Sequence, residues 1–220
     1  MLEFDAQREH YRENFGLDYH SFETQHATFV MINSEMLIAA SDGRREWGDG
    51  PTHSFPALPG LRAEADEQWA WLETTLAAAK SRGGHILPVM HHPPFLVNTD
   101  EPTQYFNWPA EVRTRLLALF TQSGVLTVLC GHTHTTTEVT DGGFTLHTVA
   151  GTAKCEDEPG TDRCSAGCDG GCDEPEGGCG YKVVTLSADA VSLEYTTLEG
   201  ADLAPCCLNG YAAPVGGACP

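Results

Sequence analysis

The amino-acid sequence predicts a layered α/β domain. Apolar runs rich in β-forming residues alternate with helical patterns over about the first 130 residues, and segments with strand-like alternation follow them. The 220-residue chain is 41% hydrophobic and 9% aromatic, which is enough for a hydrophobic core and excludes a disordered chain. The longest apolar runs fall far short of the ~20 residues that a membrane-spanning helix needs, so we expect no transmembrane segment.

The first part of the chain is expected to hold one strand and one long helix. Residues 1–25 are polar and aromatic without a sustained period, whereas residues 28–33 are an apolar run of β-formers that predicts a buried strand. Residues 41–60 contain Gly, Pro, Asp and Arg without periodicity and predict a loop. Residues 64–82 predict the clearest helix, with acids in its first turn, basic residues in its last turn and a glycine pair after it. Its core-facing stripe consists of Trp69, Leu72 and Leu76.

The middle of the chain predicts two more strands with a helix between them. Residues 85–90 predict a second strand, and residues 109–123 predict a second helix that Pro109 opens at its first position. Residues 125–130 predict a third strand. Because this run is apolar around a single Thr, we expect it to be buried on both faces of the sheet.

Two strand pairs are expected after the third strand. Residues 135–140 and 144–149 alternate in polarity and flank an Asp-Gly-Gly turn, which is typical of a hairpin. Residues 181–186 and 191–195 predict a further pair around a Ser-Ala-Asp turn. Strands and helices that alternate in this way, followed by hairpins, favour the α/β class over an all-α or all-β fold.

The cysteines are concentrated toward the C-terminus. Of nine cysteines, eight lie after residue 150 and only Cys130 lies before it. A chain that keeps its core almost free of cysteine and gathers the rest at one end suggests a separate Cys-rich region. We divide the chain into an α/β domain over residues 1–152 and 181–199, a Cys-, Gly- and acid-rich insertion over residues 153–180, and a Cys-containing tail over residues 200–220.

The insertion has too little apolar content to fold around a core of its own, so we expect cross-links to hold it. Disulfides are favoured, and they would place the protein outside the cytoplasm, periplasmic or secreted. A zinc site is the alternative, although the spacing of Cys164, Cys168 and Cys172 lacks the usual Cys-x2-Cys pairs. A calcium site or a solvated acidic loop is a further possibility. The N-terminal residues lack the features of a secretory signal.

The chain is strongly acidic. Twelve Lys and Arg against 31 Asp and Glu give a formal net charge of −19. Such a surface repels a phosphate backbone, so we expect no nucleic-acid-binding surface. The sequence does not indicate an oligomeric state.

Two groups of histidines differ in position from the rest of the ten. His91-His92 and His132-x-His134 each follow directly on a predicted strand. The loops beyond the carboxyl ends of strands are where α/β sheets build their sites, and imidazole is a good ligand for Zn, Fe and Mn. In an extended His-x-His segment both rings point the same way, so we expect the rings to converge on one point. The alternative is a set of buried histidines beside a Pro-rich turn.

These segments resemble motifs of the calcineurin-like metallophosphoesterases. Residues 128–134 are similar to the Gly-His-x-His motif of that family, and residues 87–95 to the His motif that precedes it. Residues 11–34 resemble the segment that follows the family's Asn-His motif. The resemblance covers residues 11–152 and resumes at 181–198. It implies a metal-dependent phosphoesterase on a double-sheet α/β sandwich.

The same resemblance implies roles for individual histidines. His92 and His132 would bind one metal ion and His134 the other, while His91 would lie at the rim and touch the substrate phosphate. Two divalent ions, of Fe, Mn or Zn, would hold a phosphate ester and activate a water for its hydrolysis. The resemblance assigns no catalytic side chain besides these groups.

Three earlier motifs of that family are missing from the sequence: Asp-x-His, Gly-Asp and Asn-His. Asp18-x-His20 and Gly48-Asp49 have matching letters, but neither follows a predicted buried strand. We therefore expect the chain to be the C-terminal portion of a longer enzyme, forming a partial sandwich that is inactive or nearly so by itself. The alternatives are a non-catalytic, disulfide-stapled binding module outside the cytoplasm and a degenerate member of the family.

Overall fold

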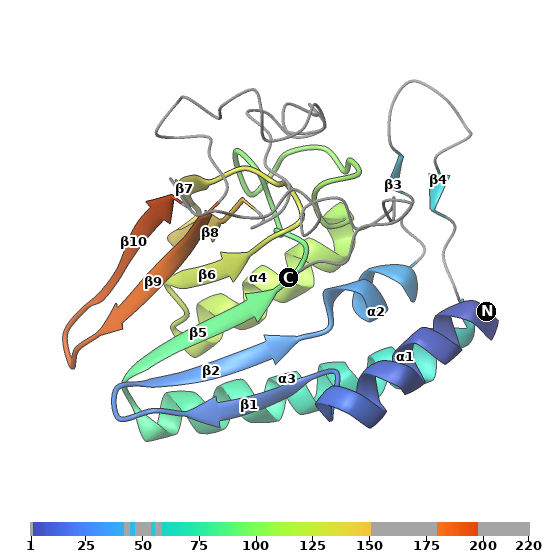
Figure 1. The fold of residues 1–220 in the computed structure, drawn as a ribbon, viewed down its shortest axis with the longest axis horizontal. Coiled ribbons are helices and arrows are strands. Elements are labelled where there is room, and N and C mark those ends of the chain that lie inside the picture. Colours follow the sequence, from blue (N-terminus) through green and yellow to red (C-terminus); the bar gives the residue numbers. More distant parts are fainter. Residues whose placement is uncertain (1, 42–44, 47–53, 56–58, 151–179, 198–220) are drawn as a thin grey trace, which may run out of the picture.

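The computed structural model of the protein is a mixed α/β fold, which confirms the predicted class. A six-stranded sheet runs in the order β1-β2-β5-β6-β8-β7, and β9 and β10 form a separate two-stranded sheet (Figure 1). The structure describes residues 2–41, 45–46, 54–55, 59–150 and 180–197. The Cys-rich insertion predicted at 153–180, apart from its last residue, and the predicted tail at 200–220 lie outside the described residues.

Four neighbouring strands of the large sheet are parallel. They are β2 (Ala27–Ile32), β5 (His85–Met90), β6 (Thr127–Cys130) and β8 (Phe144–Thr148). The three strands predicted first are therefore confirmed. Since parallel strands end at the same edge of a sheet, the segments that follow β2, β5 and β6 lie side by side.

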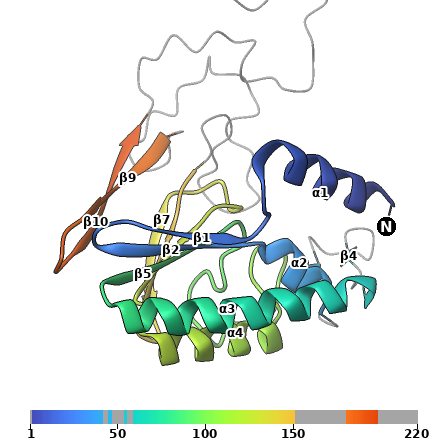
Figure 2. The same ribbon diagram turned by 90° about the horizontal axis from the view of Figure 1, so that it is seen from below.

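Two long helices cover one face of this sheet. They are α3 (Arg62–Arg82) and α4 (Ala110–Ser123), and Figure 2 shows both on the same side of the strands. Both helices are predicted correctly, except that Pro109 is the N-cap of α4 and not its first residue. Gly124 ends α4 with φ +80°, a left-handed conformation in which a glycine carries no side-chain penalty. The core between helices and sheet includes Val30, Ile86, Val128, Leu72, Leu76, Leu116 and Phe120.

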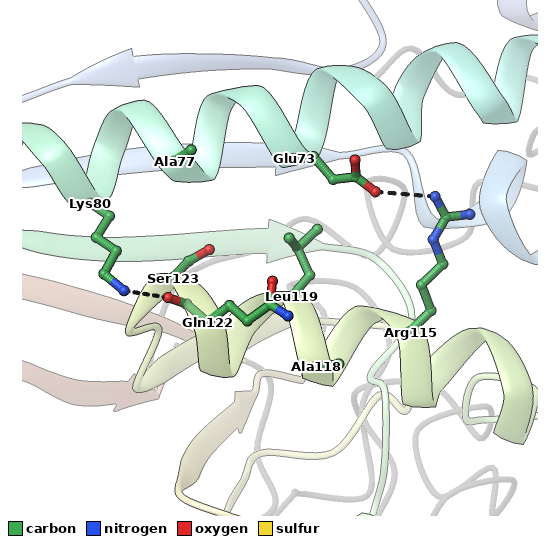
Figure 3. Close-up of a pocket in the computed structure, with 8 residues that line it drawn as sticks. All are labelled: Glu73, Ala77, Lys80, Arg115, Ala118, Leu119, Gln122 and Ser123. Atoms are coloured by element: carbon green, nitrogen blue, oxygen red, sulfur yellow. Dashed lines mark hydrogen bonds and ion pairs between the residues drawn. The ribbon is translucent and has the colours of Figure 1, made fainter.

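Polar contacts join the solvent side of the two helices (Figure 3). Arg115 Nη2 lies 3.2 Å from Glu73 Oε1, and Lys80 Nζ donates a 2.5 Å hydrogen bond to the carbonyl of Gln122. The Arg115 guanidinium also lies 4.2 Å from the centre of the Trp69 ring. About half of the Glu73 and Arg115 side chains is exposed, so this ion pair contributes little and the buried core holds the helices to the sheet.

The structure contains three elements near the N-terminus that the sequence analysis does not predict. They are α1 (Leu2–Phe15), β1 (His20–Glu23) and α2 (Ser34–Ala39). Residues 1–25, which show no sustained period in the sequence, contain two of these elements. The residues of α1 after Arg8 are almost all exposed. This part of the helix therefore has no buried apolar stripe from which the sequence could predict it. β1 is an edge strand that pairs antiparallel with β2.

The predicted loop over residues 41–60 contains short elements. Its described parts are β3 (Arg45–Glu46), β4 (Ser54–Phe55) and the start of a 3-10 turn at Pro59–Leu61. β3 and β4 pair antiparallel with each other, so the described part of this segment includes a two-residue ladder that the composition does not predict.

Both predicted hairpins are confirmed. β7 (Thr137–Asp141) pairs antiparallel with β8, and β9 (Gly180–Leu186) pairs with β10 (Val191–Thr197). The β9–β10 pair lies on the side of the large sheet away from α3 and α4 (Figure 2). There the carbonyl of Ser187 lies 3.0 Å from His85 Nε2.

The third predicted strand is less buried than expected. Residues of β6 alternate between buried and half-buried, and Leu126, just before the strand, is 67% exposed. The prediction that this strand is buried on both faces is therefore wrong, because the face of β6 away from the helices is only partly covered. No helix among the described residues combines the length and the apolar character that crossing a membrane requires.

Candidate metal centre

The two histidine segments meet at the carboxyl edge of the sheet. β5 ends at Met90 and β6 at Cys130, and these two residues are register partners. One residue further on, the backbone N–H of Gly131 donates a 3.0 Å hydrogen bond to the carbonyl of His91. The backbone therefore brings the residues after both strands to one place.

Three imidazole rings cluster there. The ring centres of His91, His92 and His132 lie 4.2–4.9 Å apart and the rings meet edge-on. One nitrogen from each ring lies within 4.8 Å of the other two, and His91 Nε2 is 3.2 Å from His132 Nδ1. His92 is buried, His132 is half-buried and His91 is exposed, so the cluster opens to solvent on one side.

His134 does not join this cluster. His132 and His134 have φ values of +69° and +56°, so the expectation of an extended backbone at this segment is wrong. Thr133 between them is buried, and its backbone N–H donates a 2.8 Å hydrogen bond to the carbonyl of Gly131. This turn places His134 in the lining of a neighbouring cavity.

That cavity has a volume of about 590 Å³ and lies between the large sheet and the β9–β10 pair. His91, His132 and His134 line it together with His147 of β8 and mostly apolar residues. Burial, followed by the charge of Lys182, lowers the pKa of His147, so this imidazole stays neutral at physiological pH. The cavity therefore places several imidazoles, including that of His147, beside mostly apolar residues.

Ser34 holds His92 in place. The Ser34 hydroxyl oxygen accepts a 3.1 Å hydrogen bond from the His92 backbone N–H and also lies 3.0 Å from His92 Nδ1. The indole Nε1–H of Trp108 donates a 2.9 Å hydrogen bond to the His92 carbonyl. All three residues are buried. The His92 backbone and the Nδ1 edge of its ring are thus both held.

Gln68 anchors the helix that carries Ser34. Its side chain is fully buried and bonds both backbone groups of Asn33, with Oε1 accepting from the N–H at 2.8 Å and Nε2 donating to the carbonyl at 3.1 Å. Asn33 in turn caps α2, because its Oδ1 accepts a hydrogen bond from the Met36 N–H. The junction of β2 and α2 is therefore fixed to α3, and Ser34 with it.

Glu101 organises the loop between His92 and α4. Its buried carboxylate accepts hydrogen bonds from three successive backbone N–H groups and from the Asn107 side chain. Arg113 of α4 donates to the backbone carbonyls of Glu101 and Trp108. This folded loop presents the rings of Tyr105 and Phe106 at 5.0 and 5.5 Å from the His132 ring, so they form an aromatic wall beside the cluster.

Two further groups lie near the imidazoles. Glu35 Oε2 is 3.4 Å from His92 Nε2, and 44% of the Glu35 side chain is exposed. Cys130 precedes the His132 segment, but full burial raises the pKa of its thiol far above physiological pH, so no thiolate is offered to a metal. Imidazoles and one carboxylate are ligand types that suit Zn, Fe or Mn.

The sequence did not indicate Ser34, Glu35, Gln68, Glu101 or Trp108 as parts of this site. Each of them contacts a partner that is remote in the sequence, or contacts residues of the loop after His92. The spacing of residues in the sequence does not predict such contacts. The metal-binding roles of His92, His132 and His134, and the substrate contact of His91, remain predictions.

Comparisons with known proteins support the phosphatase relationship. No known family pattern matches the chain. Over 127 residues it is 32% identical to the serine/threonine-protein phosphatase CPPED1 of Rattus norvegicus and 30% identical to that of Mus musculus. Each match covers 57% of this chain and 35% of the relative, so the chain spans about a third of the length of these relatives.

The fold is also found in a solved structure. GAP50, described as the anchor in the inner membrane complex of Plasmodium, matches with a TM-score of 0.53 and 15% identity, over 83% of this chain and 50% of that one. The chain thus resembles a serine/threonine-protein phosphatase over more than half of its own length. A non-catalytic binding module is not favoured by these relatives.

Proposed function

We propose that this chain, a relative of the calcineurin-like metallophosphoesterases, carries the histidine side of a metal-dependent phosphoesterase centre. The observation that supports it most directly is the convergence of His91, His92 and His132 where β5 and β6 end. Scattered core histidines would not share one point at the carboxyl edge of a parallel sheet. A divalent metal would be the cofactor and a phosphate ester the substrate.

The side chains present fit such a metal. Imidazole is neutral at physiological pH and binds Zn, Fe and Mn, so His92 and His132 are the proposed ligands of one ion and His134 of a second. When bound, a pair of divalent ions holds the phosphate and provides an activated water. The residues of this chain then orient the ligands: Ser34 and Trp108 hold His92, and Tyr105 shields His132.

Carboxylate ligands for a second ion are proposed to come from elsewhere. Asp18, whose spacing to His20 imitates a ligand motif, accepts hydrogen bonds from Arg12 and Asn33 and so has a structural role. Gly48-Asp49 lies outside the described residues. The chain spans about a third of the length of its phosphatase relatives, so we propose that full activity needs a segment bearing the missing motifs.

An activity assay tests this function. We expect the 220-residue chain with Mn²⁺ or Zn²⁺ to hydrolyse p-nitrophenyl phosphate about a hundredfold or more slowly than full-length rat CPPED1, because a two-ion centre cannot assemble. Co-expression with the part of that relative that precedes the matched region is expected to raise the rate. The H92A/H132A double variant of the chain, co-expressed in the same way, is the control.

Two results would contradict the proposal. If the co-expressed pair binds metal and stays inactive, the chain is not the histidine side of a phosphoesterase centre. If the chain alone matches the rate of the relative, the missing motifs are not needed.

We also propose that the eight cysteines beyond residue 150 are paired as disulfides outside the cytoplasm. They lie outside the described residues, so the proposal rests on composition. Titration of the denatured chain is expected to find one thiol without reductant and nine after reduction, because Cys130 is the cysteine left over. Nine thiols without reductant would overturn disulfide pairing, and zinc released on denaturation would then favour the zinc alternative.

A further inference from the structure

A groove lies between α3 and α4 on the side of these helices that faces solvent (Figure 3). Its volume is about 590 Å³, and none of the residues that line it lines the cavity beside the histidines. The apolar part of its lining consists of Ala77 and Ala118, which are exposed, and Leu119, which is half-buried. Such small side chains allow a third helix to approach closely, because the distance between packed helices depends on the side chains at the contact.

The two helices run parallel along this groove. Glu73 of α3 contacts Arg115 of α4, and Lys80 contacts Gln122, so each contact joins residues that are 42 apart in the sequence. The equal separation means that both helices advance in the same direction and in step. From one contact to the next, each helix advances by about two turns, or roughly 10 Å. Polar contacts therefore bound the groove at two points that are about two helical turns apart.

A cation lies at each of these points. The Arg115 guanidinium is 3.2 Å from Glu73 and 4.2 Å from the centre of the Trp69 ring, so its orientation is already set. Glu73 accepts from only one of the nitrogens through which a guanidinium donates. Lys80 Nζ donates to the Gln122 carbonyl and, within the described part of the chain, has no carboxylate partner. Both cations can therefore donate to further carboxylates.

We propose that this groove is a docking site for a helix of a partner protein that presents two carboxylates seven residues apart. Side chains at that spacing lie on one face of a helix and roughly 10 Å apart, which matches the separation of Arg115 and Lys80 along the helix axes. Small apolar residues between the two carboxylates pack against Ala77, Ala118 and Leu119. The interaction goes beyond the proposed phosphoesterase function, because the groove shares no residue with the metal centre.

The net charge of the chain restricts the kind of partner. Two basic residues and one acidic residue line the groove, whereas the whole chain has a formal net charge of −19. A strongly acidic protein is repelled by the rest of this surface, and charges closer than about 8 Å are only weakly screened at physiological salt. The partner therefore has its acidic residues on the docking face and is neutral or basic elsewhere. A second copy of this chain is disfavoured for the same reason.

Fluorescence anisotropy with a labelled synthetic peptide tests the charges of the groove. The probe is an end-blocked helix of about 18 residues, rich in alanine and glutamine, whose only charged residues are two glutamates seven positions apart. We expect the purified 220-residue chain to bind it at least about tenfold more tightly than a peptide with glutamine in place of both glutamates. K80E and R115E are each expected to weaken binding about tenfold, since reversal of the charge replaces an attraction with a repulsion.

R82E is the matched control for these variants. It makes the same change of charge at an exposed residue of α3 that does not line the groove, so we expect binding within about twofold of the unchanged chain. Far-ultraviolet circular dichroism checks that each variant is folded. If R115E unfolds, K80E decides the test, because the Lys80 side chain is exposed.

A second pair of variants tests the shape of the groove. A77W places an indole ring in the groove and is expected to weaken binding at least about tenfold, because the ring occupies the space of the docked helix. A78W adds the same side chain at a neighbouring exposed alanine outside the lining, and it is expected to bind as the unchanged chain does.

Four results would overturn the proposal. They are equal binding of the two peptides, an R82E chain that is weakened as much as K80E, equal binding by A77W and A78W, and self-association of the chain that K80E abolishes. The last result, measured by analytical ultracentrifugation, would show that a second copy occupies the groove. None of these measurements depends on the metal centre, so this proposal and the proposed function can fail separately.

Discussion

Substitution of His92 by alanine is expected to lower the Zn²⁺ affinity of the chain by about a hundredfold or more, the largest loss for any single histidine. His92 is the only buried ring of the cluster, and Ser34 and Trp108 hold it from two sides. A ligand that is already ordered loses little conformational entropy when the ion binds, so its removal costs more than removal of exposed His91. Competition titration with a chromophoric chelator measures the loss.

Two variants make this result specific. H10A removes an exposed imidazole on α1 and is expected to leave the affinity unchanged. S34A keeps the ring but removes the hydroxyl that lies at its Nδ1 edge, so we expect an affinity between those of the unchanged chain and H92A. An H92A chain that binds Zn²⁺ as tightly as H10A would contradict the placement of the metal at this cluster.

Substitution of Trp108 by alanine is expected to destabilise the fold by about 3–5 kcal/mol, the usual cost of removing a large buried aromatic side chain. Trp108 is fully buried in the core, and its Nε1–H satisfies the His92 carbonyl. The variant therefore leaves a cavity and an unsatisfied buried acceptor at the same time. Urea unfolding monitored by circular dichroism gives the change in free energy.

Trp108→Phe separates the two contributions. Phenylalanine keeps most of the apolar volume but cannot donate to the His92 carbonyl, so we expect a loss of about 1–3 kcal/mol. We also expect weaker Zn²⁺ binding than in the unchanged chain, because the backbone of His92 is then held only by Ser34. Equal stability of the two Trp108 variants would show that volume does not matter there and would contradict the packing described above.

Much of the scaffold is predictable from local sequence patterns. β2, β5 and β6 appear as short apolar runs, and α3 appears as a stripe of apolar residues at helical spacing. These signals are local because burial of one face repeats with the period of the element itself. α1 is missed for the same reason, since a helix whose described residues are nearly all exposed has no such stripe.

The positions of the histidines are predictable, but their contacts are not. The order of the apolar runs predicts that His92 and His132 each follow a strand. In the structure these strands are neighbours, and the sheet brings the two histidines together. The turn at Thr133, with positive φ at His132 and His134, has no signal in the sequence, because a non-glycine residue adopts that conformation only when its surroundings impose it. A turn therefore stands where the sequence predicts an extended backbone.

The supporting residues depend entirely on packing. Gln68 contacts Asn33 across 35 residues of sequence, and Ser34 contacts His92 across 58. Glu35 reaches His92 Nε2 only because the same packing sets the start of α2 against the end of β5. Hydrophobic periodicity reports which face of an element is buried, whereas which polar side chains meet depends on how those faces are stacked. The amino-acid pattern thus establishes the α/β scaffold and its histidine-bearing edge, and the three-dimensional packing selects the groups that surround the histidines.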